Sequence, residues 1–300
     1  MNSTVFLVGP GEDGRVDLVV ANQYPDASRK RIAKLFSDGA VRVDGKRVKK
    51  GAWVEEGQQI KLKSAPAENE DFRVVPESGD LEQIYKDEHI VVLNKPANMA
   101  SYPLVAGELG TLANVLVSHF PECIGVGDDP REAGLAHRLD RNTSGLLIAA
   151  RTAESWSALR AQFSAGKVEK HYLAVVHRRP VSQECEEPLL QRGKRVVIDY
   201  AGLEAHTSWT ELARADDFTL LRCQAHTGRM HQIRAHLAAC DSPIAGDTLY
   251  KGSEQEGLAG HFLHAEKISF VHPVSGEKLS FEAPLPDVRI AWLAKQGLAL

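Results

Sequence analysis

Residues 136–150 read AHRLDRNTSGLLIAA and join a polar turn to an apolar run. In the turn, Asp140 lies between Arg138 and Arg141, and nearby positive charge favours the ionised form of a carboxylate. The run GLLIAA at 145–150 predicts a strand that would hold this aspartate on a rigid sheet. An ionised aspartate can attack an electron-poor carbon without a cofactor, but on charge alone an ordinary loop salt bridge is the more common role.

The sequence around this stretch has both strand and helix patterns, and antiparallel signals dominate. A hairpin is expected where ISFVHPVSGEKLSFEAP closes around Ser275-Gly276. We therefore expect an α+β domain built on a mixed, largely antiparallel sheet with flanking helices. The expected strands include 90–96, 145–150, 171–177 and 218–225, and the expected helices are 111–120, 153–163 and 229–239.

Positive charge is concentrated near the front of the chain, although the whole chain has a formal net charge of -4. Between residues 28 and 63, eleven basic residues stand against four acidic ones. A solvated basic surface is the simple interpretation, but the crowding of charge on a small module favours RNA binding. The basic residues are Arg29, Lys30, Arg31, Lys34, Arg42, Lys46, Arg47, Lys49, Lys50, Lys61 and Lys63.

The same region has the pattern of a small α/β module. Ser28 can cap a short helix that buries Ile32, Leu35 and Phe36 and ends at Gly39. Next, VRVDGKRV at 41–48 predicts a hairpin around Asp-Gly, and a further short strand contains Ile60 and Leu62. We expect the module to span residues 1–65, a Pro- and Glu-rich linker to span 66–80, and the larger domain to span 81–300.

Composition excludes several classes of protein. The 300 residues are 43% hydrophobic, which is enough for more than one packed core. No apolar run approaches the roughly 18 to 20 residues needed to cross a bilayer, and the first residues lack the pattern of a signal peptide, so we expect a cytoplasmic protein. The four cysteines form no C-x-x-C pair, and the steps of five residues between His226, His231 and His236 would spread these side chains around a helix. We expect no metal and no cofactor, and we expect a monomer.

Several separated motifs resemble the RluA family of pseudouridine synthases. These are HRLDRNTSGLL at 137–147, VEKHYLAVV at 168–176, HTGRMHQIRAHL at 226–237 with PIAGDTLY at 243–250, and the closing segment 263–286. The basic module resembles the S-four-like RNA-binding module over about residues 13 to 63. The resemblance implies an enzyme that flips specific uridines out of structured RNA and isomerises them to pseudouridine. Large-subunit ribosomal RNA is the expected substrate, and transfer RNA is the alternative.

The resemblance also implies roles for individual residues. Asp140 matches the catalytic aspartate, Tyr172 the tyrosine that stacks on the target base, and Arg234 the arginine that pairs with the aspartate. Arg138 matches the arginine that helps to hold the flipped nucleotide, whereas His231 and Gln232 receive no role. The further residues that we expect to contact RNA are Arg141, Arg229, Arg29, Lys30, Arg31, Lys34 and Arg47.

Some positions depart from the family pattern, and two other functions compete with the proposed one. Asn142 stands where an acidic residue is common, and NKPANMASYP lacks the usual Gly and His, which leaves the target nucleotide open. The basic module alone would equally suit a non-catalytic RNA-binding protein or ribosome assembly factor. A hydrolase of the glycosidic bond would need two carboxylates, and no second carboxylate is evident around Asp140.

Overall fold

The computed structural model describes residues 3–25, 27, 29–65 and 72–300, with only the backbone described at 29–31. The chain divides into two compact units, Met1–Phe72 and Arg73–Leu300, which are considered separately. No helix in the described residues is long and apolar enough to cross a membrane.

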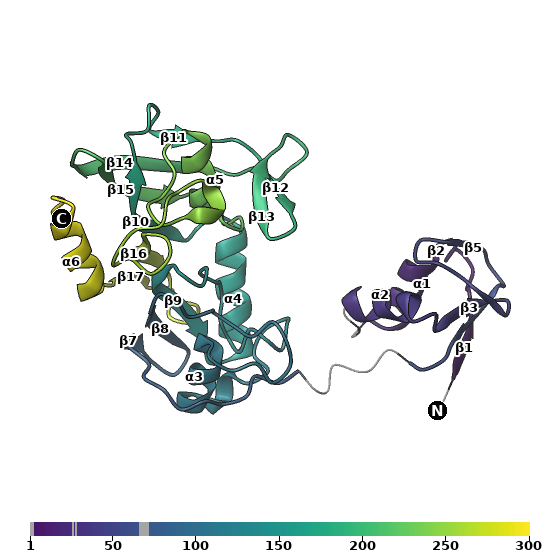
Figure 1. The fold of residues 1–300 in the computed structure, drawn as a ribbon. Coiled ribbons are helices and arrows are strands. Elements are labelled where there is room, and N and C mark those ends of the chain that lie inside the picture. The colour runs from purple at the N-terminus through teal and green to yellow at the C-terminus, as the bar shows by residue number, and fades with distance from the viewer. Residues whose placement is uncertain (1–2, 26, 28, 66–71) are drawn as a thin grey trace. The chain divides into compact units, whose positions relative to one another are not determined.

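The front unit packs two helices against a four-stranded sheet with the order β1-β6-β3-β4 (Figure 1). The expected helix is α2, and the expected hairpin turns at Asp44 and Gly45, whose φ angles are 47° and 78°. The capping position Ser28 lies outside the described residues. The elements are β1 (Thr4–Leu7), β2 (Gly14–Arg15), α1 (Val16–Gln23), α2 (Arg29–Ser37), β3 (Val41–Val43), β4 (Lys46–Arg47), β5 (Trp53–Val54) and β6 (Gln59–Leu62).

One core of the front unit lies between the helices and the sheet. Ile32 and Phe36 of α2 are buried there with Ile60 and Leu62 of β6, as the sequence predicts. Helix α1 is an additional element that the sequence did not reveal, because VDLVVANQ places its apolar residues consecutively and lacks a clear helical period.

The larger unit is built on a nine-stranded sheet with the order β11-β14-β15-β10-β16-β9-β8-β7, and β17 pairs with β16 (Figure 1). Within residues 73–300, its pairings are antiparallel except that of β9 with β16, which confirms the mixed, largely antiparallel sheet. The strands of this sheet are β7 (Gln83–Lys86), β8 (Ile90–Lys95), β9 (Ser144–Ala150), β10 (Glu169–His177), β11 (Glu184–Cys185), β14 (Thr207–Arg214), β15 (Phe218–Ala225), β16 (Leu263–Val271) and β17 (Lys278–Glu282).

The parallel pair β9 and β16 requires a glycine at the start of β9. Gly145 has φ 110°, and a Cβ atom there would stand 2.3 Å from the carbonyl oxygen of Ala265. A side chain at this position would therefore push the two strands apart. Because Asp140 lies just before β9, this close approach brings the polar turn up to the middle of the sheet.

Helices cover the sheet and supply its cores. The expected helices are present as α3 (Leu112–His119) and α4 (Ala153–Ser164), and a C-terminal helix, α6 (Asp287–Lys295), completes the unit (Figure 1). The expected helix 229–239 is wrong at its start, because α5 begins at Gln232. His231 has φ 53°, in the left-handed region, and this conformation prevents the helix from extending further back.

Two further segments affect the surroundings of the site. A hairpin of β12 (Leu189–Arg192) and β13 (Arg195–Ile198) forms a separate two-stranded sheet, and Thr248–Tyr250 forms a short 3-10 helix. Of the segment that the sequence places in a linker, residues 66–71 lie outside the described residues. In the remainder, Val74 is buried in the core beside α3, and the carbonyl oxygen of Val75 accepts a hydrogen bond from Asn114.

Candidate active site

A cavity of about 510 Å³ opens where three segments of the larger unit meet. The turn that precedes β9 contributes Arg138 and Asp140, β10 contributes Lys170 and Tyr172, and the segment between β15 and α5 contributes His231. The volume lies within the range of ligand pockets, roughly 300 to 1,000 Å³. The three motifs that are far apart in the sequence therefore line one cavity.

Buried polar side chains hold the turn that carries Asp140. The hydroxyl of Ser101 donates to the carbonyl of Leu139 over 2.8 Å and accepts from the Leu139 N–H over 3.0 Å. Lys95 is completely buried, and its Nζ donates to the carbonyl oxygens of Met99 and Arg141 over 2.7 and 3.2 Å. The residues on both sides of Asp140 are thus fixed by hydrogen bonds with buried side chains.

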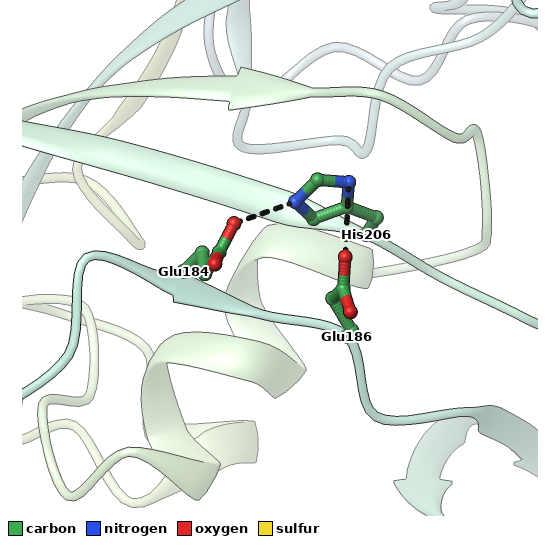
Figure 2. A group of neighbouring side chains, drawn as sticks. All are labelled: Glu184, Glu186 and His206. Atoms are coloured by element: carbon green, nitrogen blue, oxygen red, sulfur yellow. Dashed lines mark hydrogen bonds and ion pairs between the residues drawn. The ribbon is translucent and has the colours of Figure 1, made fainter.

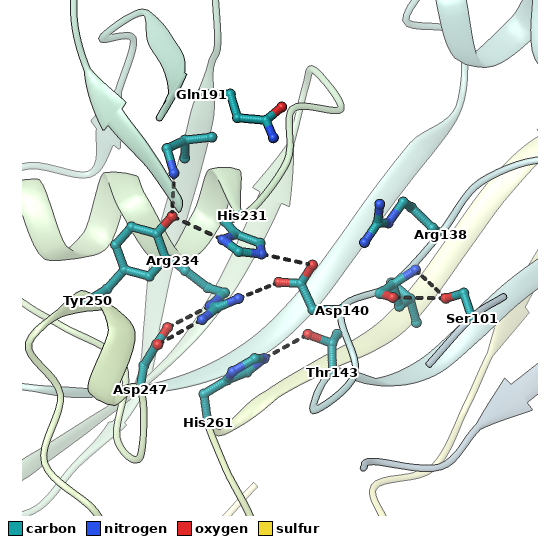
Figure 3. Close-up of polar contacts among 12 residues, drawn as sticks. Ser101, Arg138, Asp140, Thr143, Gln191, His231, Arg234, Asp247, Tyr250 and His261 are labelled. Atoms are coloured by element: carbon teal, nitrogen blue, oxygen red, sulfur yellow. Dashed lines mark hydrogen bonds and ion pairs between the residues drawn. The ribbon is translucent and has the colours of Figure 1, made fainter. Parts of the chain in front are cut away.

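Arg234 joins Asp140 to a second carboxylate, that of Asp247 (Figure 3). Nη1 of Arg234 donates to Oδ2 of Asp140 over 2.7 Å, while Nε and Nη2 donate to the two carboxylate oxygens of Asp247 over 2.6 and 2.8 Å. The side chains of Arg234 and Asp247 are only 8% and 2% exposed. Asp247 therefore anchors the guanidinium, and the guanidinium in turn orients Asp140.

The cavity keeps Asp140 ionised. Burial raises the pKa of its carboxyl, but His231 and the charged Arg234 outweigh this effect and hold the pKa below its ordinary value. The carboxylate side chain retains 18% exposure, whereas Asp247 is almost completely covered. Of the two carboxylates that Arg234 joins, Asp140 is thus the one that a ligand in the cavity can reach, and Asp247 is held in its bidentate pair.

His231 faces the other oxygen of Asp140. Its Nε2 lies 3.6 Å from Oδ1 of Asp140, and its Nδ1 lies 3.0 Å from the hydroxyl of Tyr250. The Tyr250 hydroxyl also accepts a hydrogen bond from the backbone N–H of Val196 in β13 over 2.8 Å. The ring of Tyr250 lies beneath the Arg234 guanidinium, 5.0 Å from ring centroid to Cζ.

Tyr172 lies in the wall of the same cavity. The pairing of β10 with β16 shifts register between His171 and Tyr172, and such a bulge redirects a side chain. Burial, reinforced by the negative charge of Asp140, raises the pKa of the Tyr172 hydroxyl, so the phenol stays protonated at neutral pH. Tyr172 lines the cavity together with Asp140, and its stacking on a base stays a prediction.

The arginines expected to contact RNA occupy different places. Arg138 and Arg229 line the cavity and are exposed, and the guanidinium of Arg138 lies over the ring of Tyr102 at 5.4 Å. Arg141 is exposed outside the cavity lining and donates to the carbonyl of Asn98. With the buried Lys170, Arg138 and Arg229 contribute to an excess of positive charge in the cavity, which suits a phosphate backbone.

The basic residues of the front unit are described only in part. Lys34 on α2 is exposed, and Arg47 on β4 is exposed with its guanidinium beside the end of α2, where Nη2 donates to the carbonyl of Ser37. Arg29, Lys30 and Arg31 belong to α2, but their side chains lie outside the described part of the chain. Their contact with RNA stays a prediction.

One group of residues among those described could hold a metal ion, and it does not line the cavity. His206 lies between Glu184 and Glu186, with Nε2 3.1 Å from Oε2 of Glu184 and Nδ1 3.6 Å from Oε1 of Glu186 (Figure 2). Both glutamates are exposed. Exposed acidic groups are common without a metal ion, so this cluster carries no metal assignment.

Sequence reasoning missed four residues around the site. Asp247 and Tyr250 lie within PIAGDTLY, which resembled the family as a segment without suggesting individual roles. His231 contacts Asp140, and Gln232 fixes the preceding turn by accepting from the N–H of Arg229 over 3.0 Å and donating to the carbonyl of His206 over 2.8 Å. The available signal was the segment PIAGDTLY, which follows Arg234 in the chain and contains an acidic residue, Asp247, and an aromatic residue, Tyr250.

Comparisons with known proteins identify the family of this chain. The family model described as RNA pseudouridylate synthase matches residues 89–239, and the S4 domain model matches residues 14–60. "Ribosomal large subunit pseudouridine synthase D" of Neisseria meningitidis serogroup A is 36% identical over 91% of this chain and 76% of that protein. "Uncharacterized RNA pseudouridine synthase YlyB" of Bacillus subtilis is 35% identical over 91% of both chains.

The fold has a counterpart among solved structures. A structure titled "Human RNA Pseudouridylate Synthase Domain Containing 4" superposes with a TM-score of 0.58 at 20% identity, covering 73% of this chain and 94% of the human one. The fold and the matched models together define an RNA-modifying isomerase with an N-terminal S4 domain. The chain belongs to the RNA pseudouridylate synthase family, of the RluA type.

Proposed function

We propose that this enzyme isomerises specific uridines of large-subunit ribosomal RNA to pseudouridine, and that Asp140 is its catalytic residue. Two relatives carry the substrate in their names, since proteins of Neisseria meningitidis and Xanthomonas campestris at 36% and 34% identity are named for the large ribosomal subunit. The observation that carries the catalytic assignment is the carboxylate of Asp140, held by Arg234 in a cavity while one oxygen stays free of it.

The reaction exchanges one glycosidic bond for another. The bond from ribose carbon 1′ to nitrogen 1 breaks, the base turns, and a new bond forms from carbon 1′ to carbon 5, whose hydrogen leaves as a proton. Asp140 serves this sequence either by attacking carbon 1′ or by removing the 2′ proton to give a glycal. Both routes need an ionised carboxylate, and the lowered pKa of Asp140 supplies it at neutral pH.

The other residues bind and orient the nucleotide. A uridine within a stem reaches the cavity only after it leaves the stack. We assign Tyr172 to stacking on the flipped base, since an aromatic face packs well on a pyrimidine ring, and Arg138 to holding the opened strand at the cavity mouth. Arg141, Arg229 and the basic residues of the front unit contribute phosphate contacts, which raise affinity without reading sequence. We further propose that the enzyme acts as a cytoplasmic monomer without a cofactor.

The direct test follows the hydrogen at carbon 5. Large-subunit ribosomal RNA made with uridine tritiated at carbon 5 releases tritium to water when wild-type enzyme acts on it. Asp140→Asn keeps the shape but removes the charge, and it is expected to release none. Asp217→Asn is a matched control, because Asp217 is exposed in the turn between β14 and β15 and does not line the cavity.

A map of pseudouridine in total RNA then identifies the substrate. In cells that lack this protein, particular ribosomal RNA sites should lose the modification, and wild type but not Asp140→Asn should restore them. Loss confined to transfer RNA would reassign the substrate. An unchanged map, or full rescue by Asp140→Asn, would favour the non-catalytic RNA-binding protein, and release of free uracil would indicate a hydrolase.

A further inference from the structure

The two oxygens of Asp140 have different partners. Arg234 donates to Oδ2 over 2.7 Å, whereas Oδ1 faces Nε2 of His231 at 3.6 Å, beyond hydrogen-bond distance. The oxygen that Arg234 leaves free is the one available for reaction. Whether it faces a proton or a lone pair depends on which nitrogen of His231 carries the hydrogen.

Tyr250 determines where that hydrogen lies. The backbone N–H of Val196 can only donate, so the Tyr250 oxygen accepts this bond and its own hydrogen is free to donate elsewhere. Nδ1 of His231 lies 3.0 Å from the same oxygen, where it can accept that hydrogen. Burial lowers the pKa of His231, so the ring is neutral at pH 7, and with Nδ1 as the acceptor its single proton is on Nε2, the nitrogen nearer Asp140.

The backbone and the neighbouring ring hold this arrangement in place. His231 is 12% exposed and has φ 53° immediately before α5, a left-handed conformation that is uncommon outside glycine and that recurs at functional sites. The Tyr250 ring also lies under the guanidinium of Arg234. One tyrosine therefore contacts both of the groups that flank the Asp140 carboxylate (Figure 3).

We propose that His231 is a positioning residue for Asp140, held by Tyr250 with its Nε2–H directed at Oδ1, and that Val196 links this relay to the β12–β13 hairpin. The proposal rests on the proposed function of Asp140. The N–H beside Oδ1 stabilises its negative charge and directs its lone pairs before reaction.

Two substitutions of His231 separate the relay from simple packing. In His231→Gln the amide N–H falls near the position of Nε2, whereas in His231→Asn the amide falls near the position of Nδ1. We expect His231→Asn to lower kcat about tenfold with KM unchanged, because it removes the N–H that faces Oδ1 of Asp140. His231→Gln should retain kcat within about threefold of wild type. Equal losses in both variants, or a change in KM alone, would overturn the proposal.

Tyr250→Phe tests the other end of the relay. It removes the hydroxyl but keeps the ring under Arg234, and it should lower kcat about as much as His231→Asn. The double variant should lose no more than either single variant, because each breaks the same chain of contacts. A loss of kcat in the double variant equal to the product of the two single losses would refute the relay. Tyr200→Phe removes the same atom from a tyrosine that is 88% exposed and should leave kcat unchanged.

A measurement without RNA distinguishes this proposal from the function that it rests on. In full-length protein with ¹⁵N-labelled histidine, the ring resonances of His231, assigned by their loss in His231→Gln, show which nitrogen is protonated. We expect Nε2 in wild type and a mixture of both forms in Tyr250→Phe. A proton on Nδ1 in wild type would refute the relay even in an active enzyme. Absence of any pseudouridine formation by wild type would refute the function and leave the tautomer result standing.

Discussion

Asp247 should act mainly on stability, although it shares Arg234 with Asp140, the proposed catalytic residue. Its carboxylate is 2% exposed and receives two hydrogen bonds from Arg234, whose side chain is 8% exposed. Hydrogen bonds to charged groups contribute roughly 1.5 to 3 kcal/mol each, and removing one partner of a buried ion pair costs about 3 to 5 kcal/mol. Because Arg234 keeps its bond to Asp140, Asp247→Ala should lower the free energy of unfolding by about 3 kcal/mol, at the lower end of that range.

Urea unfolding of the full-length chain measures this loss. Three of the four tryptophans, Trp156, Trp209 and Trp292, lie in the unit that contains the site, so their fluorescence reports its unfolding. Asp247→Asn retains one acceptor oxygen and should lose about 2 kcal/mol. Turnover should fall in both variants, because the guanidinium that aims Asp140 loses its anchor.

Asp140→Asn is the matched comparison. Its side chain is 18% exposed, and Arg234 remains paired with Asp247, so the variant should lose only about 1 kcal/mol while its activity is abolished. The two aspartates should thus separate, one affecting mainly stability and the other mainly catalysis. Unfolding of Asp247→Ala within about 1 kcal/mol of wild type would refute the anchoring argument.

Three further results are expected. Because the pKa of Asp140 is lowered in the folded state, its ion pair stabilises the fold above about pH 4, and this stabilisation is lost as pH falls through the folded-state pKa. Arg234→Gln removes the positive charge but leaves Asp140 buried, so the acid limb of kcat/KM should move to higher pH. An acid limb at the wild-type pH would contradict this. Ser101→Ala leaves the N–H and C=O of Leu139 without their partner and should cost about 2 to 3 kcal/mol in urea unfolding. Lys34→Ala should raise KM and reduce the slope of log KM against log salt by about 0.7 to 0.9 with kcat unchanged, whereas a fall in kcat alone would exclude a phosphate contact.

Local patterns in the sequence predicted most of the fold. The apolar run at 145–150 forms the buried part of β9, and the Asp44-Gly45 dipeptide forms a hairpin turn with both residues at positive φ. These features depend on neighbours in the chain, and a single sequence contains that information. The predicted start of α5 at residue 229 was wrong. The helix begins only after His231, whose left-handed conformation is sustained by contacts with residues distant in sequence.

The sequence by itself determined the class of enzyme and the S4 domain, and it predicted Asp140, Tyr172 and Arg234 as site residues, because each lies in a short motif whose residues are adjacent in the chain. Only the tertiary structure decided which side chains surround the carboxylate. The motif implied that Arg234 pairs with Asp140, but nothing in the sequence indicated that its side chain is only 8% exposed or that it joins Asp140 to Asp247. Such partners come together when the strands of one sheet pair, and their contacts depend on distances in space that no local pattern records.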